Sequence, residues 1–386
     1  MRFEKDWGRL GLKLSDWKEY RIGELIETIF SGGTPNTKNS DYWNGSLPWL
    51  SSGETRNRYI NVTEKTITDS GAQNSSTRQA LKGDVVMASA GQGYTRGQVS
   101  FLNIDTFINQ SVIAIRANEK VLDKKFLFYN LSSRYEELRA ISDSNSIRGS
   151  ITTKMVKSMN IRIPDLNTQK AIANTLSSID DKIETSKQIN HHLEEMATSI
   201  FENMFPNVSS GKSTIGNYII PKRGKNLLSK DAIVGKVPVV AGGLQPSTFH
   251  NIANTKSPVL TISASGANAG YVNLWHIPVW SSDSSYIDTS ITDNVYFWYV
   301  MLKKRQQEIY DSQTGSAQPH IYPKHIEIMP TIDLSEDKVS RFTKQVTPLF
   351  ESIGNNIKEI GELQTLRDTL LPKLLSGEIS VNQASK

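Results

Sequence analysis

The feature that most constrains this chain is a helical pattern that occurs twice, about 170 residues apart. The first copy steps by four and three along an apolar stripe made of Ile172, Leu176, Ile179, Ile183, Leu193 and Ile200. The second copy places Val346, Leu349, Ile353, Ile360, Leu363 and Leu370 at matching positions, and only Arg367 breaks its stripe. The seam is apolar at both ends and polar in the middle, at Ser186 and Asn190. This period is typical of coiled coils, so we expect two long antiparallel helices whose stripes form one seam.

Three residues are expected to determine where these helices begin or break. Pro348 lacks a backbone N–H inside the second copy, so we expect a break there, with Thr347 capping a helix that restarts at the proline. We expect Thr168 to cap the first helix. At 1.5 Å per residue each helix would be about 50 Å long. The pair would therefore act as a spacer.

The rest of the chain repeats one plan of globule and helix. Strand-like runs at 84–90, 98–102 and 111–117 precede a helical pattern over 123–141 and a short strand near 160–164. The run ASGANAGYVNL from Ala264 echoes the earlier ASAGQGYTRGQVSFL, and the helical run from Val295 follows the first one by 170 residues. We therefore predict an α+β protein with two similar α/β domains in a pseudo-two-fold repeat.

The predicted domain boundaries follow from this plan. Residues 1–164 form the first globular domain, 165–210 the first long helix, 211–330 the second globular domain and 331–386 the second long helix. The opening residues, up to about Ser15, have mixed charge and are expected to form a loose arm. They lack the apolar core of a signal peptide, and no run is long enough to span a bilayer, which indicates a cytoplasmic protein without a membrane partner.

The positive charge of the chain lies in its globular parts. The two helical segments, 165–205 and 331–375, hold 9 of the 44 basic and 14 of the 39 acidic residues. The remainder carries an excess of ten basic residues. A basic field favours a polyanion such as nucleic acid, although lysine can also serve solubility alone.

The sequence contains little that resembles a catalytic or metal site. There is no cysteine, no HExxH and no G-x-S-x-G, and the GKST at Gly211 lacks the earlier glycine of a phosphate-binding loop. Pro164, Asp165, Asp180 and Lys182 match the PD and D-x-K spacing of many nucleases. We expect Asp180 and Lys182 to be solvated charges on an exposed helix face, because a metal site needs convergent ligands.

Several stretches resemble the specificity subunits of type I restriction-modification systems. The carboxyl-terminal LRDTLLPKLLSGEI, from Leu366 to Ile379, is similar to the family's ending to its second conserved helix. RIGELIETIFSGGTP and the following YWNGSLPWLSSGE resemble the opening of its target recognition domains. DLNTQKAIANTLSSIDDKIE, from Asp165, is similar to its central conserved region.

The resemblance implies a subunit that recognises DNA and has no enzymatic activity. Each globule would be a target recognition domain that reads one half of a split double-stranded site, with the helices fixing the gap. Two methyltransferase subunits, which bind S-adenosylmethionine and modify adenine N6, would dock on the chain. Two restriction subunits would supply ATP-dependent cleavage with Mg²⁺. No cofactor or metal is implied for this chain.

Base reading requires polar side chains on loops and basic side chains for phosphates. The candidates in the first half are Thr34, Ser89, Gln92, Tyr94, Arg96, Arg148 and Lys154. Those in the second half are Lys222, Arg223, Lys225, Ser265, Asn268, Tyr271, Gln318, His320 and Lys324. Two other hypotheses stay open: a coiled-coil adaptor that binds proteins, and a nuclease in its own right.

Overall fold

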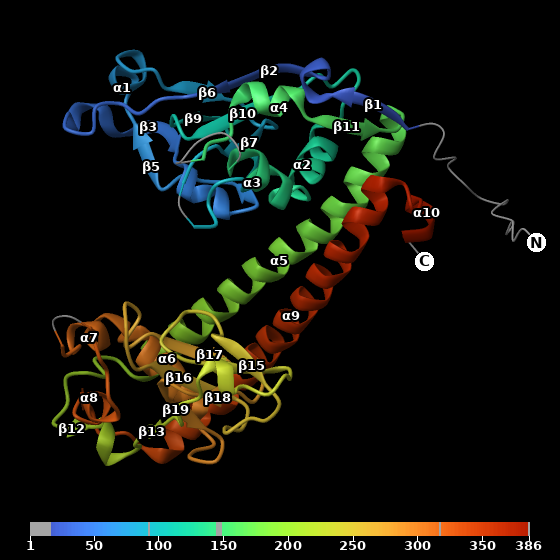
Figure 1. Cartoon of the computed structure of the whole chain (residues 1–386). Helices are drawn as coiled ribbons and strands as arrows, with labels where there is room; N and C mark the ends of the chain where they lie inside the picture. The colour runs from blue at the N-terminus through green and yellow to red at the C-terminus, as the bar shows by residue number, and fades with distance from the viewer. Residues whose placement is uncertain (1–16, 92, 144–148, 316–317, 385–386) are drawn as a thin grey trace, which may run out of the picture. The chain divides into compact units, whose positions relative to one another are not determined.

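The computed structural model describes residues 17–91, 93–143, 149–315 and 318–384. It divides into two compact units. Unit 1 comprises the chain up to Lys182 together with the segment from Leu363 onward, and unit 2 comprises Ile183–Glu362. Two long helices, α5 (Leu166–Met204) and α9 (Glu336–Ser376), contribute to both units (Figure 1). The predicted amino-terminal arm lies outside the described residues.

Unit 1 contains two main sheets. The first has the strand order β2 (Ile26–Ser31), β10 (Val112–Ala117), β7 (Val85–Ala88), β8 (Val99–Leu102), β4 (Tyr59–Ile60). The second has the order β5 (Lys65–Ile67), β3 (Trp43–Leu50), β9 (Thr106–Ile108), β6 (Arg78–Ala80). A further pair joins β1 (Lys18–Arg21) to β11 (Asn160–Ile163), and the shorter helices are α1 (Asp69–Gln73), α2 (Lys124–Ser132), α3 (Tyr135–Asp143), α4 (Thr153–Ser158) and α10 (Val381–Ala384).

Unit 2 repeats this topology with fewer strands. Its first sheet has the order β13 (Lys222–Arg223), β19 (Ser284–Asp288), β16 (Val259–Ser263), β17 (Val272–Trp275). Its second has the order β15 (Thr248–His250), β14 (Val237–Val240), β18 (Trp280–Ser281). The strand pair is β12 (Ser213–Thr214) with β20 (Pro330–Thr331), and the helices are α6 (Val295–Lys304), α7 (Gln306–Asp311) and α8 (Pro323–Glu327).

The match between the units extends to strand direction. In each first sheet the neighbouring strands β2, β10, β7, β8 and β13, β19, β16, β17 are antiparallel throughout. The second sheets share one antiparallel pairing, β3 with β5 or β14 with β15, and one parallel pairing, β3 with β9 or β14 with β18. In unit 1, β6 adds a further antiparallel pairing with β9. The predicted fold class, two similar α/β domains with two long helices, is confirmed.

The helix predicted over 123–141 is interrupted at the same place in both units. It ends at Ser132 and restarts as α3, just as α6 ends before α7. In unit 1 the Arg134 guanidinium donates a 2.9 Å hydrogen bond to the carbonyl of Asn160, and in unit 2 Arg305 donates one of 2.9 Å to the carbonyl of Pro330. The break therefore lets a buried or half-buried arginine tie the helices to the strand that leads into the long helix.

Each long helix is buried against a globular domain as well as against its partner helix. In unit 1, Ile172 and Leu176 of α5 lie in one apolar core with the α2 residues, and Leu371 and Leu374 of α9 join them. In unit 2, the ring centres of Phe201 on α5, Phe205 just beyond its end, Phe297 on α6 and Phe342 on α9 lie within 6.0 Å of one another. Of the seam residues, Ile179, Ile183, Val346 and Ile353 are buried, and Leu193, Ile200, Leu349, Ile360, Leu363 and Leu370 are half-buried.

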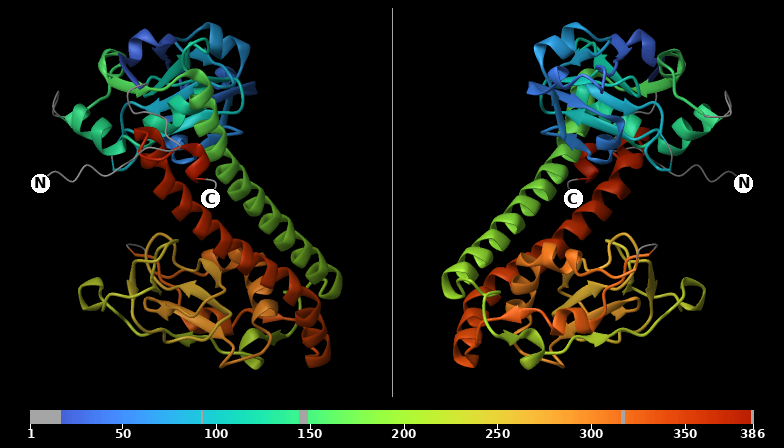
Figure 2. Two further views of the ribbon diagram at one scale, coloured as in Figure 1. Left: turned by 90° about the vertical axis from the view of Figure 1, so that its right-hand side faces the viewer. Right: turned by 90° about the vertical axis from the view of Figure 1, so that its left-hand side faces the viewer.

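The contacts within each unit give the helices opposite directions. In unit 1, Asp180 of α5 pairs with Arg367 of α9 at 2.9 Å. In unit 2, further along α5, Asn190 accepts a 2.7 Å hydrogen bond from Asn356, which lies nearer the start of α9. The residue numbers thus rise along one helix as they fall along the other, and the views of Figures 1 and 2 agree. The polar centre of the stripe is accommodated by this amide pair.

Two expectations about the helix ends were wrong. Helix α9 continues through Pro348 without a break, and the Thr347 hydroxyl donates a 2.7 Å bond to the carbonyl of Thr343 instead of capping a new helix. Buried neighbours on the same helix, Val346 and Phe350, hold the helical path and offset the missing bond.

The cap of α5 also differs from the prediction. The Asp165 carboxylate accepts bonds from the backbone N–H groups of Asn167 and Thr168 at 3.0 and 3.1 Å, so Asp165 satisfies the free donors and Thr168 lies inside the helix. The Thr168 hydroxyl donates to the same carboxylate, which lowers the pKa of Asp165.

Candidate nucleic-acid interface

The candidate surface of unit 1 is built on the loop between β7 and β8. Glycines 91, 93 and 97 in this loop have positive φ angles, which let the chain turn sharply. Tyr94 is 83 % exposed, but its carbonyl accepts a 2.9 Å bond from the Tyr135 hydroxyl, and the carbonyl of Gly93 accepts one of 2.7 Å from Arg139. Helix α3 therefore fixes a loop whose aromatic tip points outward.

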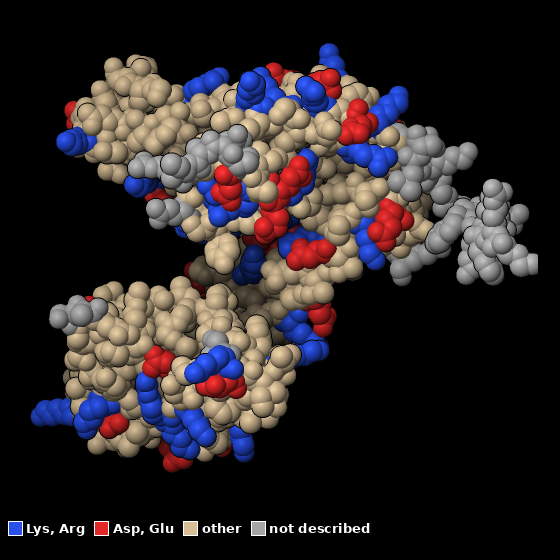
Figure 3. Space-filling view, viewed as in Figure 1, with Lys and Arg blue, Asp and Glu red and all other residues tan. Residues whose placement is uncertain are grey.

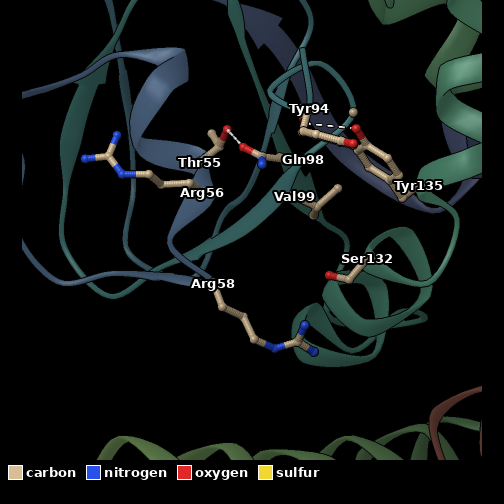
Figure 4. A pocket seen from close by; sticks show the side chains of 9 residues that line it. Thr55, Arg56, Arg58, Tyr94, Gln98, Val99, Ser132 and Tyr135 are labelled. Atoms are coloured by element: carbon tan, nitrogen blue, oxygen red, sulfur yellow. Dashed lines mark hydrogen bonds between the residues drawn. The ribbon is translucent and has the colours of Figure 1, made fainter. Parts of the chain in front are cut away.

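A polar pocket of about 390 Å³ lies beside this loop (Figure 4). Its lining combines Thr55, Arg56, Arg58, Tyr94, Gly97, Gln98, Val99, Ser132 and Tyr135. The Thr55 hydroxyl donates a 3.3 Å bond to the Gln98 amide oxygen, leaving the amide nitrogen of Gln98 as a donor on the pocket wall. Arg56, with 58 % of its side chain exposed, pairs with Glu64. The pocket thus offers amide, hydroxyl and guanidinium groups, the chemistry that base edges and phosphates engage.

The floor beside this pocket is a buried ionic cluster centred on Asp180. Its carboxylate accepts bonds of 2.9, 2.9 and 2.8 Å from Arg58, Tyr59 and Tyr129, and Arg367 of α9 adds another at 2.9 Å. Burial alone would raise the pKa of Asp180, but the two guanidinium groups and the Tyr129 hydroxyl hold it below its usual value. Burial and the adjacent carboxylate raise the pKa of both tyrosines.

This cluster corrects the expectation for Asp180. We predicted a solvated charge on an exposed helix face, yet Asp180 is only 2 % exposed. The reason is that the globular domain packs on this face of α5 and supplies Arg58 and Tyr59 from a segment 120 residues earlier in the chain. Arg367, the residue that interrupts the second apolar stripe, is its counter-charge on α9. Lys182 is exposed, as expected.

The nuclease hypothesis loses its basis with this finding. Both carboxylate oxygens of Asp180 accept hydrogen bonds from arginine or tyrosine side chains, and the Asp165 carboxylate caps α5. In the described part of the chain, no three His, Cys, Asp or Glu side chains are grouped so that they could hold a metal ion. The PD and D-x-K match is therefore a coincidence of spacing.

The remaining candidates of unit 1 lie in different environments. The Thr34 hydroxyl donates to the side chain of Gln110 in a half-buried position, and Lys154 is exposed on α4. Ser89 is 7 % exposed, and its carbonyl receives the N–H of Ile151 at 2.8 Å. Arg96 is also 7 % exposed and pairs with Asp143. Ser89 and Arg96 thus hold neighbouring loops together, while Gln92 and Arg148 lie outside the described residues.

In unit 2 the structure brings several candidates together around Asp283. This carboxylate accepts a 2.6 Å bond from Arg223 and one from the hydroxyl of Ser265. A backbone bridge joins Ser265 to His320, whose ring stacks on Tyr322 at 5.9 Å. Three segments that are far apart in sequence therefore meet at one polar surface.

The other predicted residues of unit 2 lie outside the cluster around Asp283. Lys222 is exposed beside Arg223 on β13, and the carbonyl of Lys225 anchors the Trp280 indole at 2.8 Å, which leaves the lysine side chain exposed. Gln318 and Lys324 are exposed, and Lys324 lies 3.6 Å from Glu327. The carbonyl of Asn268 accepts a 3.0 Å hydrogen bond from the N–H of Tyr271, which closes the turn between β16 and β17. Tyr271 faces the helix side instead, with the Lys303 ammonium 4.4 Å from its ring centre.

The surface charge of unit 2 is consistent with this clustering. In Figure 3, blue Lys and Arg groups gather around the position that Figure 1 labels β12, β13 and α8, with scattered Asp and Glu among them.

Of the described helices, none combines the length and apolar character that a bilayer crossing requires.

Sequence reasoning missed residues that complete these surfaces. Asp283, Asp143 and Tyr135 support predicted residues, and Arg58 and Gln98 line the pocket. Arg58, which lies just before β4, has no periodic signature in the sequence. Only the fold brings these residues together.

Comparison with known proteins identifies a domain in the first half of the chain. Residues 14–195 match the model of the type I restriction modification DNA specificity domain. The type I restriction enzyme MjaIX specificity subunit of Methanocaldococcus jannaschii is 27 % identical over 98 % of this chain and 96 % of its own. Residues 14–195 therefore carry a type I restriction modification DNA specificity domain, and nearly the whole chain is similar to a type I specificity subunit.

Two further relatives agree with this assignment. The HindI specificity subunit of Haemophilus influenzae is 26 % identical over 63 % of this chain and 53 % of its own. The fold resembles the crystal structure of a type I S subunit from M. genitalium, with a TM-score of 0.61, 21 % identity and coverage of 95 % and 98 % of the two chains. The specificity subunit is the non-catalytic member of its system, so the predicted absence of enzymatic activity is consistent with the family.

Proposed function

We propose that this specificity subunit reads a bipartite double-stranded DNA site, with one half assigned to each globular domain. The observation that carries the proposal is the duplicated topology of the two domains, down to the arginine that interrupts the same helix in each. A duplicated reader that contacts DNA through two equivalent surfaces naturally has a target in two parts.

The recognition chemistry differs between the two domains. In unit 1 the exposed ring of Tyr94 and the amide of Gln98 would contact bases, and Lys154 would contact phosphates. In unit 2 the surface around Asp283 would contribute Arg223 and His320. Major-groove edges distinguish all four base pairs by donors, acceptors and methyl groups, so two unlike surfaces would read two unlike half-sites.

The partners follow from the family. We propose that two methyltransferase subunits, which bind S-adenosylmethionine, dock on this chain and methylate adenine at N6, and that two restriction subunits bind ATP and Mg²⁺ and cut DNA. Target adenines would be flipped out by the methyltransferase partner. The DNA partner supports our expectation of a cytoplasmic location.

Gel-shift titration of the complex with its methyltransferase subunits tests the proposal. We expect affinity for one bipartite sequence above random DNA, and a steep fall in affinity as salt rises, because neutralised phosphates release counterions. A complex that binds proteins but shows no salt-dependent DNA affinity would instead support the coiled-coil adaptor. The Lys82→Ala variant, at the opposite end of β7 from the β7–β8 loop and exposed, serves as a control for non-specific charge loss.

A further inference from the structure

The two units differ at one edge of the first sheet. In unit 1, β8 is covered by β4, which runs parallel to it: the N–H of Phe101 donates to the carbonyl of Arg58 and the N–H of Asn103 to that of Ile60, both at 3.0 Å. In unit 2, β17 is the equivalent of β8 and is the last strand of its sheet. The described residues of unit 2 contain no counterpart of β4.

A difference in loop length explains the missing strand. In unit 1 the loop between β3 and β5, residues 51–64, carries both the short helical turn Ser52–Arg56 and β4. In unit 2 the equivalent loop between β14 and β15, residues 241–247, is half as long and contains neither. The chain is therefore too short at this point to lay a strand along β17.

The uncovered edge borders an apolar groove of about 840 Å³ on helix α9. The groove is lined by Leu244, Gln245, Ser257, Tyr271, Asn273, Leu274, Trp275, His276, Ile277, Tyr296, Glu351, Gly354, Asn355, Ile357 and Lys358. Leu244, Ile277 and Ile357 are each about half exposed, with 50, 51 and 50 % of their surface accessible. Such a concentration of exposed aliphatic side chains beside a concave surface is typical of a binding site.

The backbone of this edge is held by replaceable side chains. The N–H of Leu274, which corresponds to that of Phe101, donates to the side-chain oxygen of Asn273 at 3.1 Å. In unit 1 the same position is occupied by a strand carbonyl. The carbonyl of an incoming strand could replace the side-chain oxygen of Asn273, because the bond of this oxygen is a local one to the next residue of the same strand.

Unit 1 also shows which side chains such a strand carries. Arg58 lies 4.8 Å from the centre of the Phe128 ring and pairs with Asp180, while the Tyr59 ring lies 5.5 Å from Phe128. Ile60, 1 % exposed, is buried in the core. The order is basic, aromatic, aliphatic. In the groove of unit 2, Glu351 offers a carboxylate next to Phe350, the residue that replaces Asp180 in the repeat.

We propose that the edge of β17 and the groove on α9 bind an extended segment of a partner protein that carries a basic, an aromatic and an aliphatic residue in succession. The segment would pair in parallel with β17, as β4 pairs with β8. Its aromatic side chain would enter the groove between Leu274 and Tyr296, and its basic residue would pair with Glu351. This is strand addition at a sheet edge, with backbone bonds for affinity and side-chain pockets for selectivity. It goes beyond the proposed DNA reading and does not depend on it.

A peptide with the sequence of residues 56–62, Arg-Asn-Arg-Tyr-Ile-Asn-Val, is the probe because the chain itself places it at the equivalent edge. Fluorescence anisotropy of the labelled peptide, titrated with the full-length chain, should show saturable binding. An Ile277→Asp variant should weaken binding at least about tenfold, since a charge would have to be desolvated in the groove. Ile328→Asp, equally exposed at 57 % but outside the groove, should bind as the parent does.

Further variants separate loss of the binding site from misfolding of the chain. Leu244→Asp should reproduce the loss, and circular dichroism should show both groove variants to be folded. A peptide with alanine in place of tyrosine should bind more weakly than the parent peptide. The proposal is overturned if the peptide does not bind, if it binds the groove variants and the parent equally, or if duplex DNA and not the peptide protects an Ile277→Cys variant from alkylation. The absence of natural cysteine makes that last measurement specific.

Discussion

The buried cluster around Asp180 makes a quantitative prediction about the stability of unit 1. Replacing Asp180 with asparagine keeps the size of the side chain but removes the counter-charge of Arg58 and leaves Arg367 paired only with the exposed Asp368, 2.8 Å away. Removing one partner of a fully buried pair costs about 3 to 5 kcal/mol. The two arginine side chains are 27 and 14 % exposed, so water screens part of the loss and we expect about 2 to 4 kcal/mol.

Hydrogen exchange of the full-length chain under increasing urea measures this cost, because amides of β8 and α2 report unit 1 and amides of β16 and α6 report unit 2 in the same sample. We expect the opening free energy to fall in unit 1 and to stay unchanged in unit 2. Asp181→Asn, one residue along the helix and exposed, is the matched control and should change stability by less than about 0.5 kcal/mol.

The pH dependence of the free energy of unfolding tests whether the ionised Asp180 carboxylate is responsible for this stability. The pKa of Asp180 is lowered in the folded chain, so its contribution is fully present above the pKa of an unfolded aspartate, about 3.9, and is lost as the pH falls through the folded value. The difference between the parent and Asp180→Asn should therefore shrink in acid. Equal stability of the Asp180 and Asp181 variants at pH 7, or a difference that does not change below pH 4, would refute the ionic interpretation.

Three further predictions concern the helices and the DNA surface. Pro348→Ala restores an N–H that can donate to the Lys344 carbonyl and should stabilise unit 2 by about 1 to 3 kcal/mol in urea denaturation; destabilisation would show that the proline is required for packing. Lys222→Ala should lower DNA affinity of the methyltransferase complex similarly for all sequences and reduce the salt slope by about one, whereas a sequence-dependent loss would assign it to base reading. Inserting about one helical turn, 3.6 residues, near Ser186 should lengthen the gap between half-sites by about one base pair in a methylation map, and an unchanged gap would contradict a ruler.

The periodic parts of the fold could be predicted from the sequence. The two long helices, the strands around 85–88, 99–102 and 112–117, and the duplication itself all leave repeating apolar patterns. Side chains that complete a core across long sequence distances leave none. Phe201 and Phe350 are buried yet lie off the predicted stripe, because the globular domain of unit 2 packs on the helices at an angle that the stripe alone does not define.

The polar contacts were harder to predict for the same reason. Asp180 looked like a surface charge because its partners Arg58 and Tyr59 come from a loop that bears no relation to the heptad pattern. Arg367 looked like a defect in the second stripe, although its partner lies in the first. In the candidate surfaces, Tyr94 and Lys222 are exposed as base or phosphate contacts require, whereas Arg96 and Ser89 are buried by the loops they support. Polarity and loop position identify such residues, but exposure depends on the fold.

Long-read methylation mapping of cells that carry the chain with its methyltransferase subunits tests the division of labour between the two domains most directly. The parent chain should produce one methylated motif in two parts separated by a fixed gap. Tyr94→Ala should relax or abolish recognition in one half of that motif, and His320→Ala should do so in the other half. An undivided motif, or two variants that alter the same half, would contradict the assignment of one half-site to each domain.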